Sequence, residues 1–264
     1  DERDGVLRMA TTVDDRWSSV SENRTVSKNN VYTLNEDLEV LGSLTGLAEE
    51  EDIYSTRFVG DKLYMVTFRQ IDPFFVIDLS NPEEPVNQGE LKITGFSRYL
   101  HPYDNETIIG IGKAATEQGR SLGVKISLFD VSDVNNPQEI ASYTTESDYS
   151  NSNVLFEHKA FLFDRQRNLL VIPAHSYESD FWIRREGEQR REGANYNGAM
   201  VFNITKDDIS LRGLIDHSMA DESNYYRPLV ERSLYIEELL YTKSSQLLRI
   251  NALDDLHSVK NITL

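Results

Sequence analysis

The chain has no cysteine. This absence excludes disulfide bonds, thiolate metal ligands and cysteine nucleophiles. Cysteine usage therefore does not indicate the redox compartment of the protein. Long apolar runs are lacking too, because no stretch approaches the roughly 20 apolar residues that cross a bilayer as a helix. Stability must therefore come from side-chain packing, for which 39% hydrophobic residues in a chain of 264 are sufficient.

Positive charge is scarce as well. Lys and Arg number 27 against 44 Asp and Glu, which gives a formal net charge of −17. Such a balance repels phosphate backbones and anionic lipid surfaces, so we expect no nucleic-acid partner. The lack of a long apolar run predicts no membrane span. The excess of carboxylates is typical of a solubilising surface.

Local signatures of catalysis are also missing. The chain has neither a GxSxG elbow nor a glycine-rich phosphate loop before a helix. No two of the five histidines are spaced as HxH or HxxxH, the spacings that would hold a metal. The histidines are His101, His158, His175, His217 and His257. The sequence therefore favours a protein that is not an enzyme and has no cofactor, no catalytic residue and no metal ligand.

What the sequence does contain is an internal repeat. The stretch VIDLSNPEEPVNQ, which begins at Val76, is nearly repeated as FDVSDVNNPQEI from Phe129. Related strand endings centred on Asn recur at Asn35, Asn203 and Asn251. Repeats with a period of roughly 40 to 50 residues point to arrays of the propeller type. Longer intervals between some copies indicate inserted loops.

A second pattern precedes each ending and reads as strand, tight polar turn, strand. The four predicted turns are Gly60-Asp61, Asp104-Asn105, Asp164 to Asn168 and Glu237-Glu238. The ending supplies a third strand, and the segment after the Asn-Pro turn supplies a fourth. Four antiparallel strands per unit make one blade, so we predict an all-β fold, a β-propeller, with almost no helix.

The repeats predict a single propeller region over 1–264, with four full blades and a partial first blade. Their approximate ranges are 4–45 for the partial blade and 53–93, 96–145, 157–217 and 226–264 for the full ones. The first unit shows three strands, so we expect its innermost strand to be missing before Asp1. On this interpretation the chain is a fragment of a larger propeller.

The repeated ending is interpreted as the corner between the third and fourth strands of a blade. The carboxylates of Asp78 and Asp130 are expected to accept hydrogen bonds from the backbone of the turn that follows, while Pro82 and Pro137 fix φ at the bend. Calcium binding is the alternative role for these aspartates, although no calcium motif supports it.

Several strings resemble, together and in order, the secreted archaeal and bacterial proteins that carry a C-terminal β-propeller domain distantly related to WD-repeat proteins. They are YSTRFVGDKLYMVTFRQIDPFFVIDLSNP, LHPYDNETIIGIG, GVKISLFDVSDVNNP, HKAFLFD and RSLYI. The resemblance covers almost the whole chain. It implies an extracytoplasmic protein with an export signal and further blades upstream, and it implies no activity. The Trp-Asp ending of true WD repeats is absent.

Long loops between second and third strands are expected to share one face of the propeller, called here the long-loop face. These loops are Asp14 to Asn29, Lys113 to Gly123 and Ser176 to Asn197, with the shorter Phe68 to Pro73. Such loops are more often functional or disordered than neutral. Since aromatic and Arg side chains anchor interfaces, the candidate binding residues are Trp17, Phe181, Trp182 and Arg184.

A second candidate site lies on the first strands, which line the channel of a propeller. Four cations, Arg57, Arg98, Lys159 and Arg232, precede the apolar part of four successive first strands. They could form a ring of cations for a carboxylate, phosphate or acidic peptide. Alternatively, each cation pairs with a neighbouring acid such as Glu157 or Glu231, because unpaired buried cations are costly.

The sequence therefore favours a non-catalytic extracytoplasmic module, secreted or on the cell envelope, that recognises a protein or glycan through its long-loop face. One alternative is a hydrolase or lyase that holds an anionic substrate with Arg57, Arg98 and Arg232 and uses His158 as base. The other is a purely structural part of a larger propeller, with the missing N-terminal blades as its partner.

Overall fold

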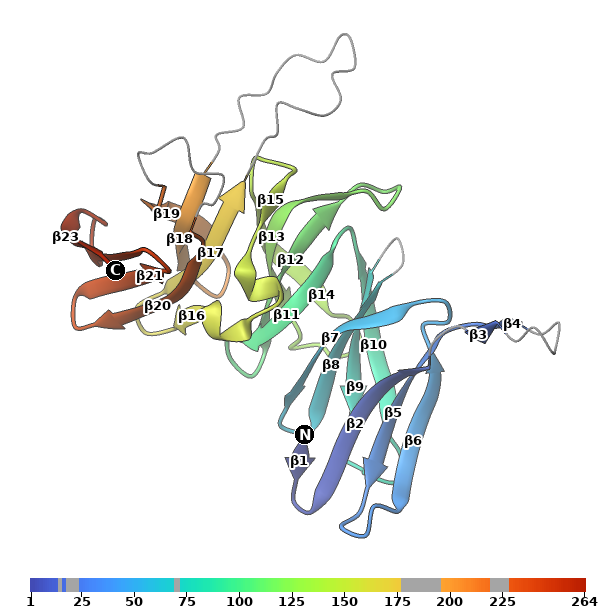
Figure 1. Ribbon diagram of the computed structural model, residues 1–264. Helices are drawn as coiled ribbons and strands as arrows, with labels where there is room; N and C mark the ends of the chain where they lie inside the picture. Colours follow the sequence, from blue (N-terminus) through green and yellow to red (C-terminus); the bar gives the residue numbers. More distant parts are fainter. Residues whose placement is uncertain (14–15, 18–23, 69–71, 177–195, 219–227) are drawn as a thin grey trace, which may run out of the picture. The chain divides into compact units, whose positions relative to one another are not determined.

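The computed structural model describes residues 1–13, 16–17, 24–68, 72–176, 196–218 and 228–264, and β-strands make up most of them (Figure 1). The strands form five antiparallel sheets of at least four strands each, with one additional pair. The prediction of an all-β chain of four-stranded units is thus confirmed. Helical structure among the described residues is limited to η1 (Asn153–Leu155) and η2 (His158–Ala160), both short 3₁₀ turns.

The first sheet has four strands, not the three that the sequence indicated. Its order is β1 (Glu2–Arg3), β2 (Val6–Val13), β5 (Lys28–Leu34) and β6 (Val40–Leu47). The unexpected strand β1 is only two residues long and pairs with β2 through Glu2 and Arg3. Two residues carry no strand pattern, which is why the sequence did not reveal it. Within the first long loop, β3 (Arg16–Trp17) pairs with β4 (Arg24–Thr25).

The second and third sheets follow the predicted hairpins closely. The second sheet contains β7 (Asp52–Val59), β8 (Lys62–Phe68), β9 (Asp72–Asp78) and β10 (Val86–Ile93). The third contains β11 (Phe96–Pro102), β12 (Thr107–Ala115), β13 (Ser121–Asp130) and β14 (Gln138–Thr144). Central strands such as β8 are buried along their whole middle, whereas the outer strand β14 alternates between exposed and half-buried residues.

The fourth sheet departs from the prediction at its innermost strand. Its strands are β15 (Ser150–Asn151), β16 (Leu162–Asp164), β17 (Leu169–Ser176), β18 (Tyr196–Ile204) and β19 (Ile209–Asp216). β15 and β16 both pair with β17 and flank the two 3₁₀ turns, so the continuous strand expected from Glu157 is wrong. The side chains of Ser152 and Glu157 cap those turns by accepting from the backbone amides of Val154 and Lys159.

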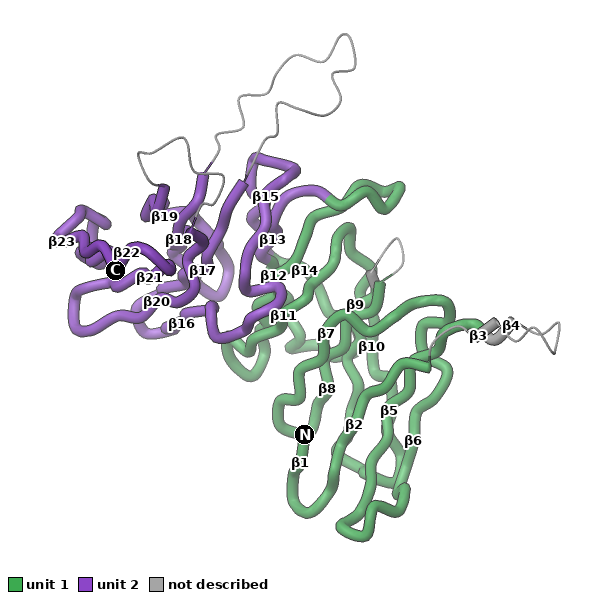
Figure 2. The backbone as a smooth tube through the Cα atoms, in the orientation of Figure 1, with its two compact units in different colours: residues 1–121, 127–140 green, residues 122–126, 141–264 purple. Residues whose placement is uncertain are grey.

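The fifth sheet has the order β20 (Val230–Ile236), β21 (Leu239–Ser244), β22 (Leu247–Ala252) and β23 (Ser258–Thr263). The chain divides into two compact units (Figure 2): unit 1 comprises residues 1–121 and 127–140, and unit 2 comprises 122–126 and 141–264. Two apolar clusters lie in unit 1, where the first three sheets pack face to face, and one lies in unit 2 between the fourth and fifth sheets.

The repeated corner behaves as the sequence predicted. Asp78 Oδ1 accepts from the amide of Ser80 at 2.8 Å, and Asp130 Oδ1 accepts from the amide of Ser132 at 2.9 Å. The second oxygen of Asp78 accepts from Gln88 Nε2 at 2.8 Å. Both carboxylate oxygens of Asp78 therefore hold the corner together, which is the structural role expected of such a turn.

Each corner of unit 1 also packs against a glycine of the preceding sheet. A Cβ added to Gly42 of β6 would lie 2.4 Å from the Pro82 carbonyl oxygen, and one added to Gly89 of β10 would lie 2.2 Å from that of Val134. No side chain fits in either place. The Thr33 hydroxyl donates to the same Pro82 oxygen. The repeated corner is thus a contact between neighbouring sheets as well as a turn.

Candidate functional site

Three aromatic rings meet in unit 1 at the end of the second and third sheets. The ring centroids of Tyr54 and Phe68 are 5.2 Å apart, those of Tyr54 and Phe96 are 5.1 Å apart, and those of Phe68 and Phe96 are 4.8 Å apart. All three side chains are half-buried. Phe68 is the last residue of β8, so the cluster lies at the end from which the Phe68 to Pro73 loop leaves.

Arg98 completes this cluster. Its guanidinium carbon lies 4.7 Å from the centroid of the Tyr54 ring and 6.0 Å from that of Phe96. A guanidinium over an aromatic face is stabilised by the ring quadrupole. Tyr54, Phe68, Phe96 and Arg98 are called here the aromatic–arginine cluster. A half-buried set of this composition is typical of interface anchors.

Strand geometry explains why these residues meet. β7 and β11 are the innermost strands of neighbouring sheets, and Ser55 Oγ donates to the Ser97 carbonyl at 2.7 Å. The sequence predicted Arg98 as a channel cation, but the three rings beside it were not predicted, because they lie on strands and not in the long loops where anchors were expected. A signal was present in the repeat itself, since an aromatic residue followed by Ser recurs near the start of both first strands, at Tyr54-Ser55 and at Phe96-Ser97.

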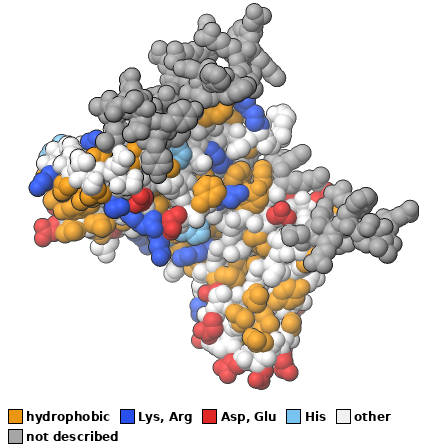
Figure 3. Space-filling view, viewed as in Figure 1, with side chains coloured by type: hydrophobic (Ala, Val, Ile, Leu, Met, Phe, Trp, Pro, Cys, Tyr) orange, Lys and Arg blue, Asp and Glu red, His pale blue; other side chains and the backbone are white. Residues whose placement is uncertain are grey.

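The opposite end of unit 1 has a different chemistry. There the turns of the first sheet expose the acidic residues Asp4, Glu36, Asp37 and Glu39. Figure 3 shows acidic side chains gathered at the lower end of this sheet. In the turn between β5 and β6, Asn35 Oδ1 accepts hydrogen bonds from the amides of Asp37 and Glu39. Solvated acidic turns of this kind are ordinary solubilising surface. The aromatic–arginine cluster lies at the other end, where Glu51 accepts from the Thr67 hydroxyl and Glu49 and Glu50 are exposed.

Arg57 lies on β7, as predicted, and is half-buried. Among the residues that the structure describes, no carboxylate forms an ion pair with it. Its charge acts on β11: burial first, and Arg57 second, lower the pKa of His101 to about 4. Burial raises the pKa of Tyr99, whose hydroxyl lies 3.1 Å from His101 Nδ1. His101 is thus neutral near pH 7.

The other proposed channel cations are engaged locally within unit 2. Arg232 Nη2 lies 3.5 Å from Glu157 Oε2, which is the pairing that the sequence analysis offered as the alternative to a free cation. Glu231 pairs with Lys243 at 2.8 Å. Lys159 and His158 belong to η2 and not to a first strand, so the expectation for Lys159 is wrong. The hydrogen bond from the Lys159 amide is the main cause that lowers the pKa of Glu157.

Most of the anchors predicted in the loops cannot be located in the structure. Phe181, Trp182 and Arg184 lie outside the described residues, and for Trp17 the structure gives only its backbone pairing with Arg24. The expected long loop from Lys113 to Gly123 is mostly strand, because β12 continues to Ala115 and β13 begins at Ser121. The five residues between them form a turn closed by the Thr116 amide and the Arg120 carbonyl at 2.9 Å.

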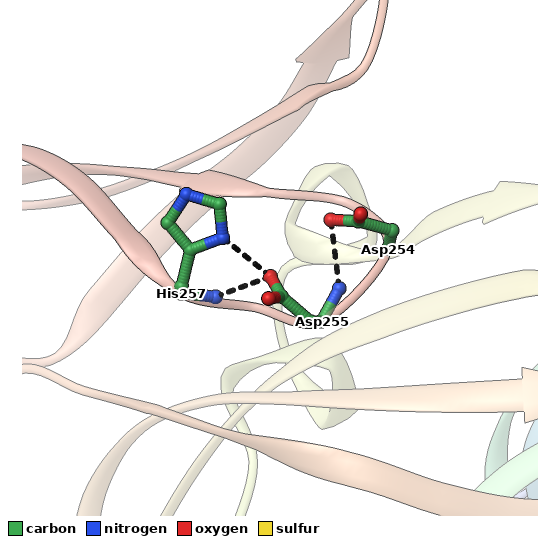
Figure 4. Close-up of side chains that lie close together, drawn as sticks. All are labelled: Asp254, Asp255 and His257. Carbon is green, nitrogen blue, oxygen red and sulfur yellow. Dashed lines mark hydrogen bonds and ion pairs between the residues drawn. The ribbon is translucent and has the colours of Figure 1, made fainter.

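One group of potential metal ligands occurs among the described residues, at Asp254, Asp255 and His257 (Figure 4). Their contacts are those of a turn: Asp255 Oδ1 accepts from the His257 amide at 3.0 Å and lies 2.6 Å from His257 Nδ1. The Arg212 guanidinium donates to the carbonyls of Leu253 and Asp254 beside it. A fixed cation next to three exposed side chains disfavours a second cation, so we assign this group to the turn.

Comparison with known proteins adds the following. A family model described as a beta propeller domain matches residues 1–256. An uncharacterised protein of Methanocaldococcus jannaschii is 39% identical over 244 residues, which are 92% of this chain and 32% of that protein. An uncharacterised protein of Archaeoglobus fulgidus is 48% identical over 174 residues, which are 66% of this chain and 25% of that protein. The chain spans a third or less of these relatives.

Proposed function

Because the chain belongs to the β-propeller domain family, we propose that it is a non-catalytic binding or scaffold module that recognises a protein or glycan through its long-loop face. Propeller domains commonly mediate interactions with other proteins. No helix among the described residues has the length and apolar character needed to span a membrane. We further propose that the module works outside the cytoplasm, as a secreted or envelope protein.

The observation that carries the proposal is the aromatic–arginine cluster. It combines three half-buried rings with a stacked guanidinium, and it lies at the sheet end where a loop between second and third strands begins. Aromatic faces contact the apolar faces of sugars and the side chains of proteins, while Arg donates to their oxygens. Trp17, Phe181, Trp182 and Arg184 are proposed as further anchors contributed by the loops.

The test measures retention of glycans and proteins from an envelope fraction of Methanocaldococcus jannaschii on the immobilised chain. Arg98→Ala and Phe181→Ala/Trp182→Ala are expected to weaken retention by about tenfold or more, since an interface anchor contributes at least about 1.4 kcal/mol. Arg57→Ala is the matched control, because it removes a half-buried arginine from the neighbouring first strand without touching the cluster.

Circular dichroism of each variant checks that the sheets are intact. Equal retention by the wild type, Arg98→Ala and the loop variant would remove the support for a binding role of this face. Retention lost in the Arg57→Ala variant instead would favour the channel-side cations as the recognition site, with an anionic ligand.

A further inference from the structure

The turn between β11 and β12 contains the pattern Asn-x-Ser/Thr, as Asn105-Glu106-Thr107. This pattern, with x other than proline, is the acceptor for N-linked glycans in exported proteins. The chain has four such sequons, which begin at Asn23, Asn105, Asn203 and Asn261, and Asn23 lies outside the described residues. A chance match is distinguished from a functional one by the fold, because in a chance match each residue has an ordinary structural role.

The hydroxyl of Thr107 is buried without a hydrogen bond. Thr107 is 0% exposed, and its Oγ1 has no hydrogen-bond partner among the described residues. Its backbone carbonyl, by contrast, helps to close the turn by accepting from the amide of Tyr103 at 2.9 Å. A buried hydroxyl without a partner destabilises the folded state. Valine has the same branched shape and suits a strand equally well, so folding alone favours valine at this position.

The other sheets show that the turn itself does not require this hydroxyl. In the last four sheets, a backbone carbonyl between the first and second strands accepts from an amide at the end of the third strand. These carbonyls belong to Asp61, Glu106, Asn168 and Glu238, at 2.7 to 2.9 Å from the amides of Leu79, Val131, Ile204 and Leu253. The next residue begins the second strand, and in the fourth sheet it is Leu169, which is also 0% exposed. The buried position therefore accepts an apolar side chain.

Asn105 likewise has no structural role in the turn. Its side chain is exposed and forms no hydrogen bond with the residues that the structure describes. The side chain that holds the turn is that of Asp104, whose Oδ1 accepts from the Glu106 amide at 2.9 Å. Asn is common in turns because it tolerates a positive φ, but Asn105 is not among the residues with a positive φ. Its exposed amide can carry a bulky group without a clash.

The sequons in the last two sheets differ in this respect. Asn203 stands where the two aspartates of the repeated corner stand, and it is half-buried on β18 between β17 and β19. Thr205 Oγ1 accepts from the Asp207 amide at 3.4 Å. Asn261 Oδ1 accepts from Ser258 Oγ at 3.3 Å. These residues have local structural roles, so the sequon at Asn105 is the one that the described fold leaves unexplained.

We propose that Asn105 carries an N-linked glycan, and that the Thr107 hydroxyl serves this modification and not the folded turn. The proposal depends on the location outside the cytoplasm proposed above. The donor is a glycan held as a phosphate ester of a lipid. Asn105 Nδ2 forms a bond to C1 of the first sugar, the bond from C1 to the phosphate oxygen breaks, and the lipid phosphate leaves with the electron pair and takes up one Nδ2 proton.

The burial of Thr107 sets the time of this reaction. In the folded chain the hydroxyl is inaccessible, so the sequon can be recognised only before the hairpin of β11 and β12 has formed. The glycan would then lie far from the aromatic–arginine cluster. β11 begins with Phe96 of the cluster and ends at Pro102 beside the turn, and its 7 residues span about 20 Å. Glycosylation at Asn105 therefore leaves the cluster uncovered.

The test produces the 264-residue chain with an added export leader in an archaeal host that glycosylates its exported proteins. Peptide mass spectrometry with electron-transfer fragmentation measures the occupancy of Asn105. The wild type and Thr107→Ser should carry a glycan there, because both keep the sequon. Thr107→Val should lower the occupancy at least about tenfold, and Asn105→Gln should abolish modification of this peptide. Thr107→Val is the matched variant, because it removes the hydroxyl and keeps the asparagine.

An unmodified Asn105 in the exported wild-type chain would overturn the proposal, and so would a glycan that Thr107→Val retains. The leader separates these outcomes from the proposed location, because forced export presents the site wherever the natural protein works. Location is tested separately by fractionating cells that make the natural protein.

A second measurement tests the role of the hydroxyl in the folded turn, with chain made in a bacterial cytoplasm and therefore without the glycan. Thr107→Val should raise Tm by about 2–4 °C, because it removes a buried hydroxyl that has no partner. Thr107→Ser keeps the hydroxyl and loses the buried methyl group, so it should lower Tm. A lower Tm for Thr107→Val would show that the hydroxyl stabilises the turn, which would overturn its assignment to glycosylation.

Discussion

Single residues set the response of this protein to acid. His217 is 0% exposed, its Nε2 lies 2.8 Å from Thr242 Oγ1, and burial lowers its pKa from 6.5 to about 4, with Arg249 as a smaller cause. His101 has a pKa lowered to about 4 in the same way. The unfolded chain therefore binds protons at these sites between about pH 6.5 and 4, where the folded chain does not. Stability rises with pH through this window and is lost as pH falls through it.

His217→Gln is expected to reduce this acid sensitivity. The amide of Gln can keep the hydrogen bond to Thr242 but cannot bind a proton, so the variant avoids a loss on the order of 2 kcal/mol at pH 5. Thermal unfolding by circular dichroism at pH 7 and pH 5 measures the effect as a smaller drop in Tm than in the wild type. His257→Gln, which changes an exposed histidine, is the control.

An equal drop in Tm for the wild type and His217→Gln would show that His217 does not titrate in this window.

The histidine positions themselves were visible in the sequence, but their burial was not. Burial depends on which sheet face covers the residue, and His217 follows β19 in a connection without a repeat pattern. Arg98 illustrates the same limit, because its place over Tyr54 depends on the packing of β7 against β11.

Elements of this fold are joined by contacts between backbones. Gly42 and Gly89 lie on the outer strands β6 and β10, and each meets the corner of the next sheet. In unit 2 Gly213 of β19 lies where an added Cβ would be 3.0 Å from Leu256 Cδ1, at the turn between β22 and β23. The same position thus contains glycine in three sheets. A side chain at Gly42 or Gly89 would push the corner away and loosen the sheet interface, because the atoms it would meet belong to the backbone.

Gly89→Ala should lower the free energy of unfolding by about 2–3 kcal/mol, because the added methyl group has no space beside the Val134 carbonyl. Urea unfolding should show a lower midpoint at an unchanged slope. Glu90→Ala is the control, since its exposed side chain lies next in the strand and its change should stay within about 0.5 kcal/mol. A midpoint for Gly89→Ala equal to that of Glu90→Ala would contradict the close contact.

At this scale the sequence predicted most of the elements. The hairpin turns at Gly60-Asp61 and Glu237-Glu238 were predicted because each is a short polar pair between two apolar strands. In the structure Gly60 and Glu237 both adopt a positive φ. The third-to-fourth corners were predicted because the Asp-x-Ser pattern is a local one. The interruption between β15 and β16 was not, since the 3₁₀ turn at His158 forms within a stretch whose residues also suit a strand.

At the scale of the whole molecule, net charge affects the stability of the folded state. A formal net charge of −17 makes the compact state repel itself, and salt screens that repulsion. The ion pairs among the described residues are mostly exposed, as at Lys28–Glu49 and Lys243–Glu231, so screening them costs little. Salt should therefore stabilise the folded state by reducing repulsion more than it destabilises it by weakening these ion pairs.

Raising NaCl from 20 mM to about 150–500 mM should raise Tm by on the order of a few degrees, because the Debye length falls from more than 20 Å to 10 Å or less. Differential scanning calorimetry at pH 7.5 measures this shift. KCl should give the same shift as NaCl, which separates screening from binding of a specific cation. A Tm that falls with salt would mean that ion pairs contribute more than net repulsion removes.

The glycines on the outer strands have a wider consequence. Where two main chains touch with no side chain between them, the spacing between the two sheets is set at that point by the backbone and not by the volume of the core. Substitutions among the buried Val, Ile and Leu residues can then accumulate without altering that spacing. In unit 1, neighbouring sheets can therefore keep this spacing only while glycine occupies these two positions, 42 and 89.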